Sequence, residues 1–233
     1  MTTDFALPIE IVRTNRKKTA SIEICNNTIK ITVPNKLTDK HINELIQKRA
    51  NWITKKLATR KEQTPHKPKE WVNGETFTYL GRNYRLKLIN THSTETKLRN
   101  GYLEVPNQTD LTTTKQVAAL KTSVTDWYVK QARNKLQQKT DRYAAIMNVT
   151  PNTIKIRDYK ARWGSCSAKG DIAYNWRILI APNGIVDYVV VHELAHLLEH
   201  NHSPQYWKNV GHILPDYQDS KEWLKRNANA LQI

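Results

Sequence analysis

The pentad His192-Glu-Leu-Ala-His196 limits the possible folds of this chain more than any other segment. It follows three valines, and residues 185–191 are apolar apart from Asp187. Residues four apart share one face of an α-helix, so a helix brings the two imidazoles together with Glu193 beside them. We therefore expect a buried, rigid helix over residues 185–201 that presents these polar side chains.

This spacing is typical of catalytic zinc sites, in which histidines bind the ion at roughly 2.0–2.1 Å and a glutamate activates bound water. A catalytic site needs a third protein ligand. His200 is a poor choice, because on an unbroken helix its Cα lies roughly 12 Å beyond that of His192. His202 comes within reach if the helix ends first. Asn201 as a left-handed C′ residue, followed by Ser203-Pro204 as N-cap and N1 of a new helix, predicts that ending.

The predicted zinc ligands are His192, His196 and His202. Glu193 is the predicted general base. Glu222 is the alternative third ligand, because some enzymes with this pentad take a glutamate from a later helix. A metzincin is disfavoured, because Glu199 replaces the usual Gly and no Met follows the motif. The competing structural interpretation is an ordinary amphipathic helix whose histidines are core or cap residues.

The charge of the chain points to anionic partners. Among its 233 residues, 37 are Lys or Arg and 21 are Asp or Glu, a formal net charge of +16. Such a surface attracts polyanions and nucleotide phosphates over about 8–10 Å. We therefore consider nucleic acid as a partner; the alternative is that scattered charge only maintains solubility.

Other features of the chain predict a soluble, cytoplasmic protein. No apolar stretch approaches the roughly 18 residues of a membrane span, so no membrane partner is expected. The N-terminus lacks the basic and apolar regions of a secretory signal. The two cysteines, Cys25 and Cys166, are far apart in sequence and suggest no disulfide framework. The oligomeric state is not evident from the sequence.

Residues 1–110 predict a β-rich N-terminal region with one helix. Alternating or β-branched runs predict strands at residues 9–13, 20–25, 28–33, 76–80, 84–89, 96–98 and 102–105. Turns are expected at Asn26-Asn27 and, as a type I′ turn, at Asn100-Gly101. A period near 3.6 predicts an amphipathic helix from Thr38 to about Lys61. The prolines within residues 63–69 predict an extended connector.

Residues 111–233 predict a second, mostly helical domain. Residues 112–147 contain neither Gly nor Pro, and their apolar positions predict one long helix. Strands are expected at residues 154–159 and 172–179, before the helix with the pentad. Trp163, Gly164 and Cys166 are expected in a packed strand and turn beside the site. The fold class is thus α+β, with a small sheet and the active-site helix in the C-terminal part.

Several ordered motifs resemble the YgjP-like metallopeptidase family, which is distantly related to the SprT-like zinc proteases. They are Arg162-Trp-Gly-Ser-Cys-Ser167, Tyr174-Asn-Trp-Arg177, the pentad, Asn201-His202-Ser203 and Tyr206-Trp207. The similarity extends through most of the chain. It implies a zincin-like metallopeptidase domain at residues 111–233 and the same ligand and base roles as above. Tyr206 stands where family members usually have Phe.

The expected function is a zinc-dependent hydrolase in which Glu193 activates metal-bound water to cleave peptide bonds. Arg162, Arg177 and Tyr206 are the expected substrate contacts. For the two arginines the reason is that a cation near the metal can stabilise an oxyanion or bind phosphate, and the alternative is a solvated strand face. The resemblance also implies a second activity, UTP pyrophosphohydrolysis, although no Walker-type loop is present. A third hypothesis is a nucleic-acid-associated binding module whose zinc is structural.

Overall fold

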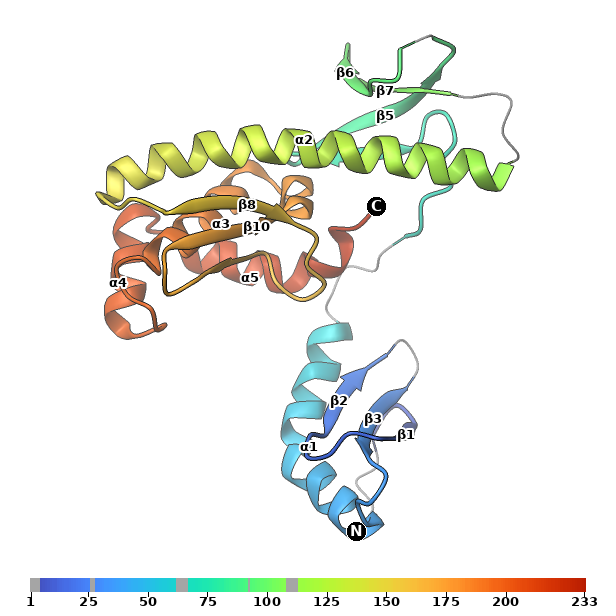
Figure 1. Cartoon of the computed structure of the whole chain (residues 1–233), viewed down its shortest axis with the longest axis vertical. Helices are drawn as coiled ribbons and strands as arrows, with labels where there is room; N and C mark the ends of the chain where they lie inside the picture. The colour runs from blue at the N-terminus through green and yellow to red at the C-terminus, as the bar shows by residue number, and fades with distance from the viewer. Residues whose placement is uncertain (1–4, 26–27, 62–66, 92, 108–112) are drawn as a thin grey trace. The chain divides into compact units, whose positions relative to one another are not determined.

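The computed structural model describes residues 5–25, 28–61, 67–91, 93–107 and 113–233 (Figure 1). Strands and helices are mixed throughout, which confirms the α+β class. Two compact units divide the chain, residues 1–63 and residues 64–233. None of the described helices has the length and apolar character required to cross a membrane.

The first unit is a three-stranded sheet covered by one helix. Its elements are β1 (Ile9–Thr14), β2 (Ser21–Ile24), β3 (Ile29–Pro34) and α1 (Asp39–Lys61). The central strand β3 runs parallel to β1 and antiparallel to β2. The core of this unit consists of Ile29, Ile31, Val33, Ile42, Ile46 and Ile53. The predicted amphipathic helix is confirmed, whereas the predicted turn at Asn26-Asn27 lies outside the described residues.

The second unit begins with a four-stranded sheet. Its strands are β4 (Thr76–Tyr79), β5 (Arg82–Ile89), β6 (Lys97–Arg99) and β7 (Tyr102–Pro106), in the order β4-β5-β7-β6. Asn100 and Gly101 have φ angles of 50° and 80°, as the predicted hairpin turn requires. Residues 63–66 of the predicted connector lie outside the described part of the chain.

The four-stranded sheet shares its core with the long helix that follows, α2 (Thr113–Met147). Phe77 and Leu86 of the sheet belong to the same buried cluster as Leu120 and Val124 of α2. The contacts thus separate compact units near residue 63. The division at residue 110 stays a prediction about domain organisation.

The remainder of the second unit supports the candidate site. Its elements are β8 (Thr153–Arg157), β9 (Gly164–Cys166), β10 (Asp171–Asn175), the 3₁₀-helix η1 (Trp176–Ile180), α3 (Asn183–Ala195), α4 (Pro204–Ile213), α5 (Tyr217–Asn227) and the 3₁₀-helix η2 (Ala228–Ala230). Strands β8, β9 and β10 form a three-stranded sheet. Its central strand β10 runs parallel to β8 and antiparallel to β9. The long helix α2 extends along this sheet, and the ribbon of α3 lies behind the strands in Figure 1. In the strand order β8-β10-β9, both β8 and β9 are edge strands.

Two predicted element boundaries are wrong. The strand expected over residues 172–179 ends at Asn175, whose side chain accepts a hydrogen bond from the Arg177 backbone N–H at 3.2 Å and thereby caps η1. The helix expected to reach Asn201 ends at Ala195. There the backbone changes to hydrogen bonds between residues three apart, with Leu198 N–H donating to Ala195 O at 3.1 Å, and these tighter turns close the helix.

An ion pair connects α2 to the helix that carries the pentad. Lys139 Nζ lies 2.5 Å from Asp187 Oδ1, and both side chains are nearly buried, at 11% and 14% exposure. Asn183 donates a second hydrogen bond to Asp187. Lys139→Met leaves this carboxylate without its cation, and we expect the free energy of unfolding to fall by about 3 kcal/mol.

Denaturant unfolding of the purified protein measures this loss. The double variant Lys139→Met/Asp187→Leu removes both charges and is expected to regain much of the stability. Unchanged unfolding of Lys139→Met would show that the ion pair does not stabilise the contact between the two helices.

Candidate metal centre

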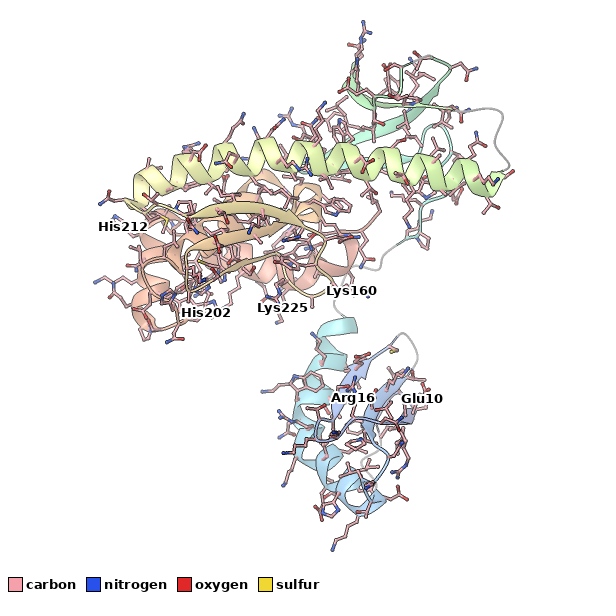
Figure 2. The ribbon with its side chains drawn as sticks, in the orientation of Figure 1. Glu10, Arg16, Lys160, His202, His212 and Lys225 are labelled. Atoms are coloured by element: carbon pink, nitrogen blue, oxygen red, sulfur yellow. The ribbon has the colours of Figure 1, made fainter. Side chains whose placement is uncertain are left out.

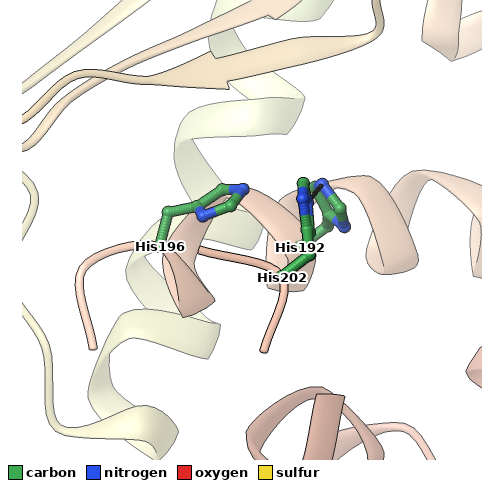
Figure 3. A group of neighbouring side chains, drawn as sticks. All are labelled: His192, His196 and His202. Atoms are coloured by element: carbon green, nitrogen blue, oxygen red, sulfur yellow. Dashed lines mark hydrogen bonds between the residues drawn. The ribbon is translucent and has the colours of Figure 1, made fainter. Parts of the chain in front are cut away.

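Three imidazoles converge where α3 ends (Figure 3). His192 lies in the last turns of α3, His196 is its C-cap, and His202 comes from the segment before α4. Each offers a nitrogen atom, and the three atoms lie within 4.8 Å of one another. The Nε2 atoms of His192 and His202 are 3.3 Å apart, about the edge of a tetrahedron whose metal–nitrogen bonds are roughly 2.0–2.1 Å.

The segment between α3 and α4 brings His202 back towards the helix. After the tight turns at the end of α3, the Ser203 N–H donates to Asn201 O at 2.7 Å. Ser203 is the N-cap of α4 and accepts a hydrogen bond from the Tyr206 N–H, with Pro204 in the first turn, as predicted. The predicted left-handed conformation of Asn201 is wrong, because Asn201 is absent from the residues with positive φ. The reversal begins earlier, at Ala195.

Burial favours the neutral form of two of the imidazoles, those of His192 and His196. The pKa of His192 is lowered to about 3, chiefly by burial and further by the neighbouring His196 and His202. Burial also lowers the pKa of His196, against the effect of its hydrogen bond to the Glu199 backbone. Neutral imidazoles retain the lone pairs that a cation needs.

The hydrogen bonds of the cluster fit a metal ion. His196 Nδ1 lies 3.3 Å from Glu199 O, and a proton on that nitrogen leaves Nε2 available as a ligand. The buried Nδ1 of His192 has no hydrogen-bond partner among the described residues. Its Nε2 faces that of His202, so one of these two nitrogens must be protonated unless a cation lies between them. The donor set therefore suits a borderline-soft ion such as zinc.

Aromatic rings support the three histidines. The ring centroid of Tyr206 lies 4.7 Å from those of His196 and His202, and its hydroxyl donates to His192 O at 2.8 Å. Tyr206 is fully buried, so its visible contacts are structural and its role in substrate binding stays a prediction. Trp207 stacks on His202 with centroids 5.5 Å apart. Trp207 was not among the predicted site residues, although its place in the first turn of α4 puts it close to His202.

Glu193 is held against the edge strand β9. Its side chain is buried, with 5% of the residue exposed. Burial raises the pKa of Glu193 to about 8, and the positive charge of Arg162 acts in the opposite direction. A Cβ atom on Gly164 would lie 2.4 Å from Glu193 Oε1 and 2.6 Å from its Cγ. The expected packing of Gly164 thus has a specific purpose, because only glycine leaves room for this carboxylate.

This close approach predicts a large effect of Gly164→Ala. The added methyl group must displace the Glu193 carboxylate, and a displacement of about 1 Å is expected to lower hydrolytic turnover by about 100-fold. The bound metal, measured by elemental analysis, should be unchanged, because the three atoms nearest to the added methyl group all belong to Glu193 and not to a histidine.

Gly184→Ala is the matched control, since a Cβ there meets no atom within 4 Å. Turnover equal to wild type in Gly164→Ala would contradict the assigned contact.

The two arginines that were predicted to contact the substrate line one cavity. Arg162 and Arg177 both line a cavity of about 390 Å³. Its other lining residues are 158–161, Trp163, Asn175, Ala228, Asn229, Leu231 and Gln232. Figure 2 labels Lys160, a further cation of its lining. Arg177 forms an ion pair with Asp158 and lies over the Trp176 ring. The three histidines do not line this cavity, so the basic cavity is a neighbour of the metal centre and not part of it.

The two other residues considered as a third metal ligand, Glu222 and His200, are not part of the described histidine cluster. On α5, Glu222 forms ion pairs with Lys225 and Arg226.

The family model described as YgjP-like, metallopeptidase domain, matches residues 18–227. The chain belongs to the YgjP-like metallopeptidase family. The match includes the histidine cluster, Glu193 and Gly164, and membership supports a metallohydrolase.

Two solved structures are similar to parts of the chain. One is the metallopeptidase zymogen abylysin of Pyrococcus abyssi, with 24% identity, coverage of 40% of this chain and 97% of that one, and a TM-score of 0.36. The other is the metallopeptidase zymogen jannalysin of Methanocaldococcus jannaschii, with 16% identity, 38% and 92% coverage, and a TM-score of 0.35. These structural similarities are too weak to support a functional assignment. No curated protein matches the sequence.

Proposed function

We propose that this protein is a zinc-dependent peptidase in which His192, His196 and His202 hold the ion and Glu193 is the general base. The observation that carries the proposal is the contact of Glu193, the residue after His192, with the backbone of the edge strand β9. When bound, the ion supplies Lewis-acid activation of water and of the scissile carbonyl.

The edge strand favours a peptide as the substrate. Trp163 O accepts from the Asn175 N–H at 2.8 Å, and the Ser167 N–H donates to Asp171 O at 2.9 Å, so these positions face β10. Hydrogen bonding alternates along an antiparallel strand, and Gly164 and Cys166 therefore direct their N–H and C=O groups to the opposite edge. Among the described residues, no other strand pairs with that edge. An extended peptide can add there as a strand.

Each residue then has a definite task in hydrolysis. A cation held by the three histidines would favour the ionised form of Glu193. Its carboxylate would then accept a proton from the attacking water and deliver it to the leaving amide nitrogen as the C–N bond breaks. Gly164 allows that carboxylate to lie directly beside the backbone to which the peptide pairs. Tyr206 and Trp207 pack against the imidazoles and hold them in place.

The basic cavity supports one competing function, UTP pyrophosphohydrolysis. Arg162, Arg177 and Lys160 line it, and guanidinium groups bind phosphate oxygens well. Asp158 forms an ion pair with Arg177, so the net positive charge of the cavity is smaller than its cations alone would give. We rank the peptidase first because the strand edge next to Glu193 matches an extended backbone.

A parallel assay separates the two functions. The purified, zinc-loaded full-length chain is incubated with casein and a peptide library, and in a second arm with UTP. Peptide products are detected by mass spectrometry and pyrophosphate by a coupled assay. The proposal expects peptide products in the first arm, and Arg162→Ala should affect this activity less than Glu193→Gln. Turnover of UTP without any peptide cleavage would overturn it in favour of the pyrophosphohydrolase.

A further inference from the structure

An exposed tryptophan lies among four cations on α1, in the N-terminal unit. Trp52 is 43% exposed, although large aromatic side chains are usually buried. Residues three and four positions away share its side of the helix. All four of these positions are Lys or Arg with exposed side chains: Lys48, Arg49, Lys55 and Lys56. We call these five residues the Trp52 face.

The acidic residues of α1, Asp39 and Glu44, both precede the Trp52 face in the helix. From residue 45 to residue 58 the sequence contains no Asp or Glu. In the described part of the chain, no ion pair involves Lys48, Arg49 or Lys56. Residues 1–63 hold 13 Lys and Arg against 6 Asp and Glu, a net charge of +7 on about a quarter of the chain. The small unit is therefore the more densely basic of the two.

The apolar core of the unit does not include the residues of the Trp52 face. Ile42, Ile46 and Ile53 are the buried residues of α1, and they pack with β3. In Figure 1, α1 lies along one side of the three-stranded sheet. Trp52 and its four neighbours belong neither to this apolar core nor to the histidine cluster. An aromatic ring surrounded by cations is an arrangement that fits stacked bases and phosphates.

We propose that the Trp52 face binds single-stranded nucleic acid, with the indole stacking on a base and the four cations contacting phosphates. An unpaired strand is favoured over a duplex, because a flat ring can stack only on a base that is not already stacked on both sides. An anionic membrane fits less well, because a membrane-binding helix needs an apolar face to insert and that of α1 is covered by the sheet. This binding would be an activity separate from hydrolysis.

Fluorescence anisotropy with the full-length protein tests the proposal. The probe is a labelled, mixed-sequence RNA strand of about 20 nucleotides, titrated over a range of salt concentrations. The quadruple variant Lys48→Gln/Arg49→Gln/Lys55→Gln/Lys56→Gln is expected to weaken binding at least about tenfold. It should also reduce the slope of log K against log salt by about 3, because each neutralised phosphate contributes roughly 0.7 to that slope. Trp52→Ala should weaken binding by about tenfold and leave the slope unchanged.

The control carries the same change of charge in the same unit. Lys17, Lys18, Lys36 and Lys40 are also exposed, and only Lys40 lies on α1, well away from Trp52. When all four are replaced by Gln, the slope of log K against log salt should equal that of wild type. In this background Trp52→Ala should still weaken RNA binding. Circular dichroism melting curves should match for all variants, because every replaced side chain is exposed.

Three results would overturn the proposal. The first is an equal loss of RNA binding in the control variant, which would show that net charge alone acts. The second is unchanged binding by Trp52→Ala. The third is Trp52-dependent binding to phosphatidylserine vesicles without RNA binding, which would assign the face to a membrane surface.

Discussion

Glu193→Gln is expected to lower hydrolytic turnover by about 10²–10⁴-fold while the protein keeps its metal. The amide has nearly the shape of the carboxylate and fits the space beside Gly164. It cannot accept a proton from water, so the loss reports the base function alone. Because Glu193 is buried, removal of its ionisable carboxyl group also relieves a desolvation cost, and the variant should fold at least as stably as wild type.

The measurement combines steady-state turnover of the best substrate with elemental analysis of the same preparation. Glu222→Gln makes the same chemical change on α5, where the carboxylate pairs with Lys225 and Arg226. We expect it to retain wild-type turnover and wild-type metal content. If Glu193→Gln kept full turnover with full metal occupancy, another group would have to serve as the base.

His202→Ala is expected to release the metal, and activity with it. The side chain contributes one of the three nitrogens of the cluster and faces Nε2 of His192 at 3.3 Å. Loss of an outer-shell partner of a metal ligand already lowers affinity by about 10–100-fold. Loss of a ligand should therefore exceed that range. His202 is exposed, so the fold should remain intact and the effect should appear in metal affinity, measured by competition with a chromophoric chelator.

His200→Ala is the matched control, two residues earlier in the same segment. Its side chain is exposed and is not part of the described cluster. Metal affinity should equal that of wild type. A loss of metal in His200→Ala with retention in His202→Ala would exchange the roles of the two histidines and contradict the proposed centre.

Local patterns predicted much of the architecture. The amphipathic helix near residues 38–61 and the long helix over residues 112–147 appear within one residue of their expected bounds, because regular apolar spacing over many turns leaves little ambiguity. The cap formed by Ser203 and Pro204 was equally readable, since it depends on residues within one turn.

The errors lie where neighbouring segments compete with local propensity. The run after Asn175 has the β-branched character of a strand, yet the Asn175 side chain, which also donates to Tyr159 O and Arg162 O, diverts the backbone into η1. The pentad helix continues as an apolar pattern beyond Ala195, but the chain turns there and brings His202 back to within 3.3 Å of His192. No helical periodicity encodes such a return.

The sequence by itself determined the chemistry available to this protein: two imidazoles and a carboxylate at helical spacing, a third histidine after a break, and a large positive charge. These are properties of residue type and local spacing, and both can be read along the chain. Tertiary structure alone decided that Gly164, 29 residues before Glu193, provides the space for its carboxylate, and that the two arginines share a cavity outside the histidine cluster. Such contacts join segments distant in sequence, and they depend on how β9 packs on α3, which no local pattern specifies.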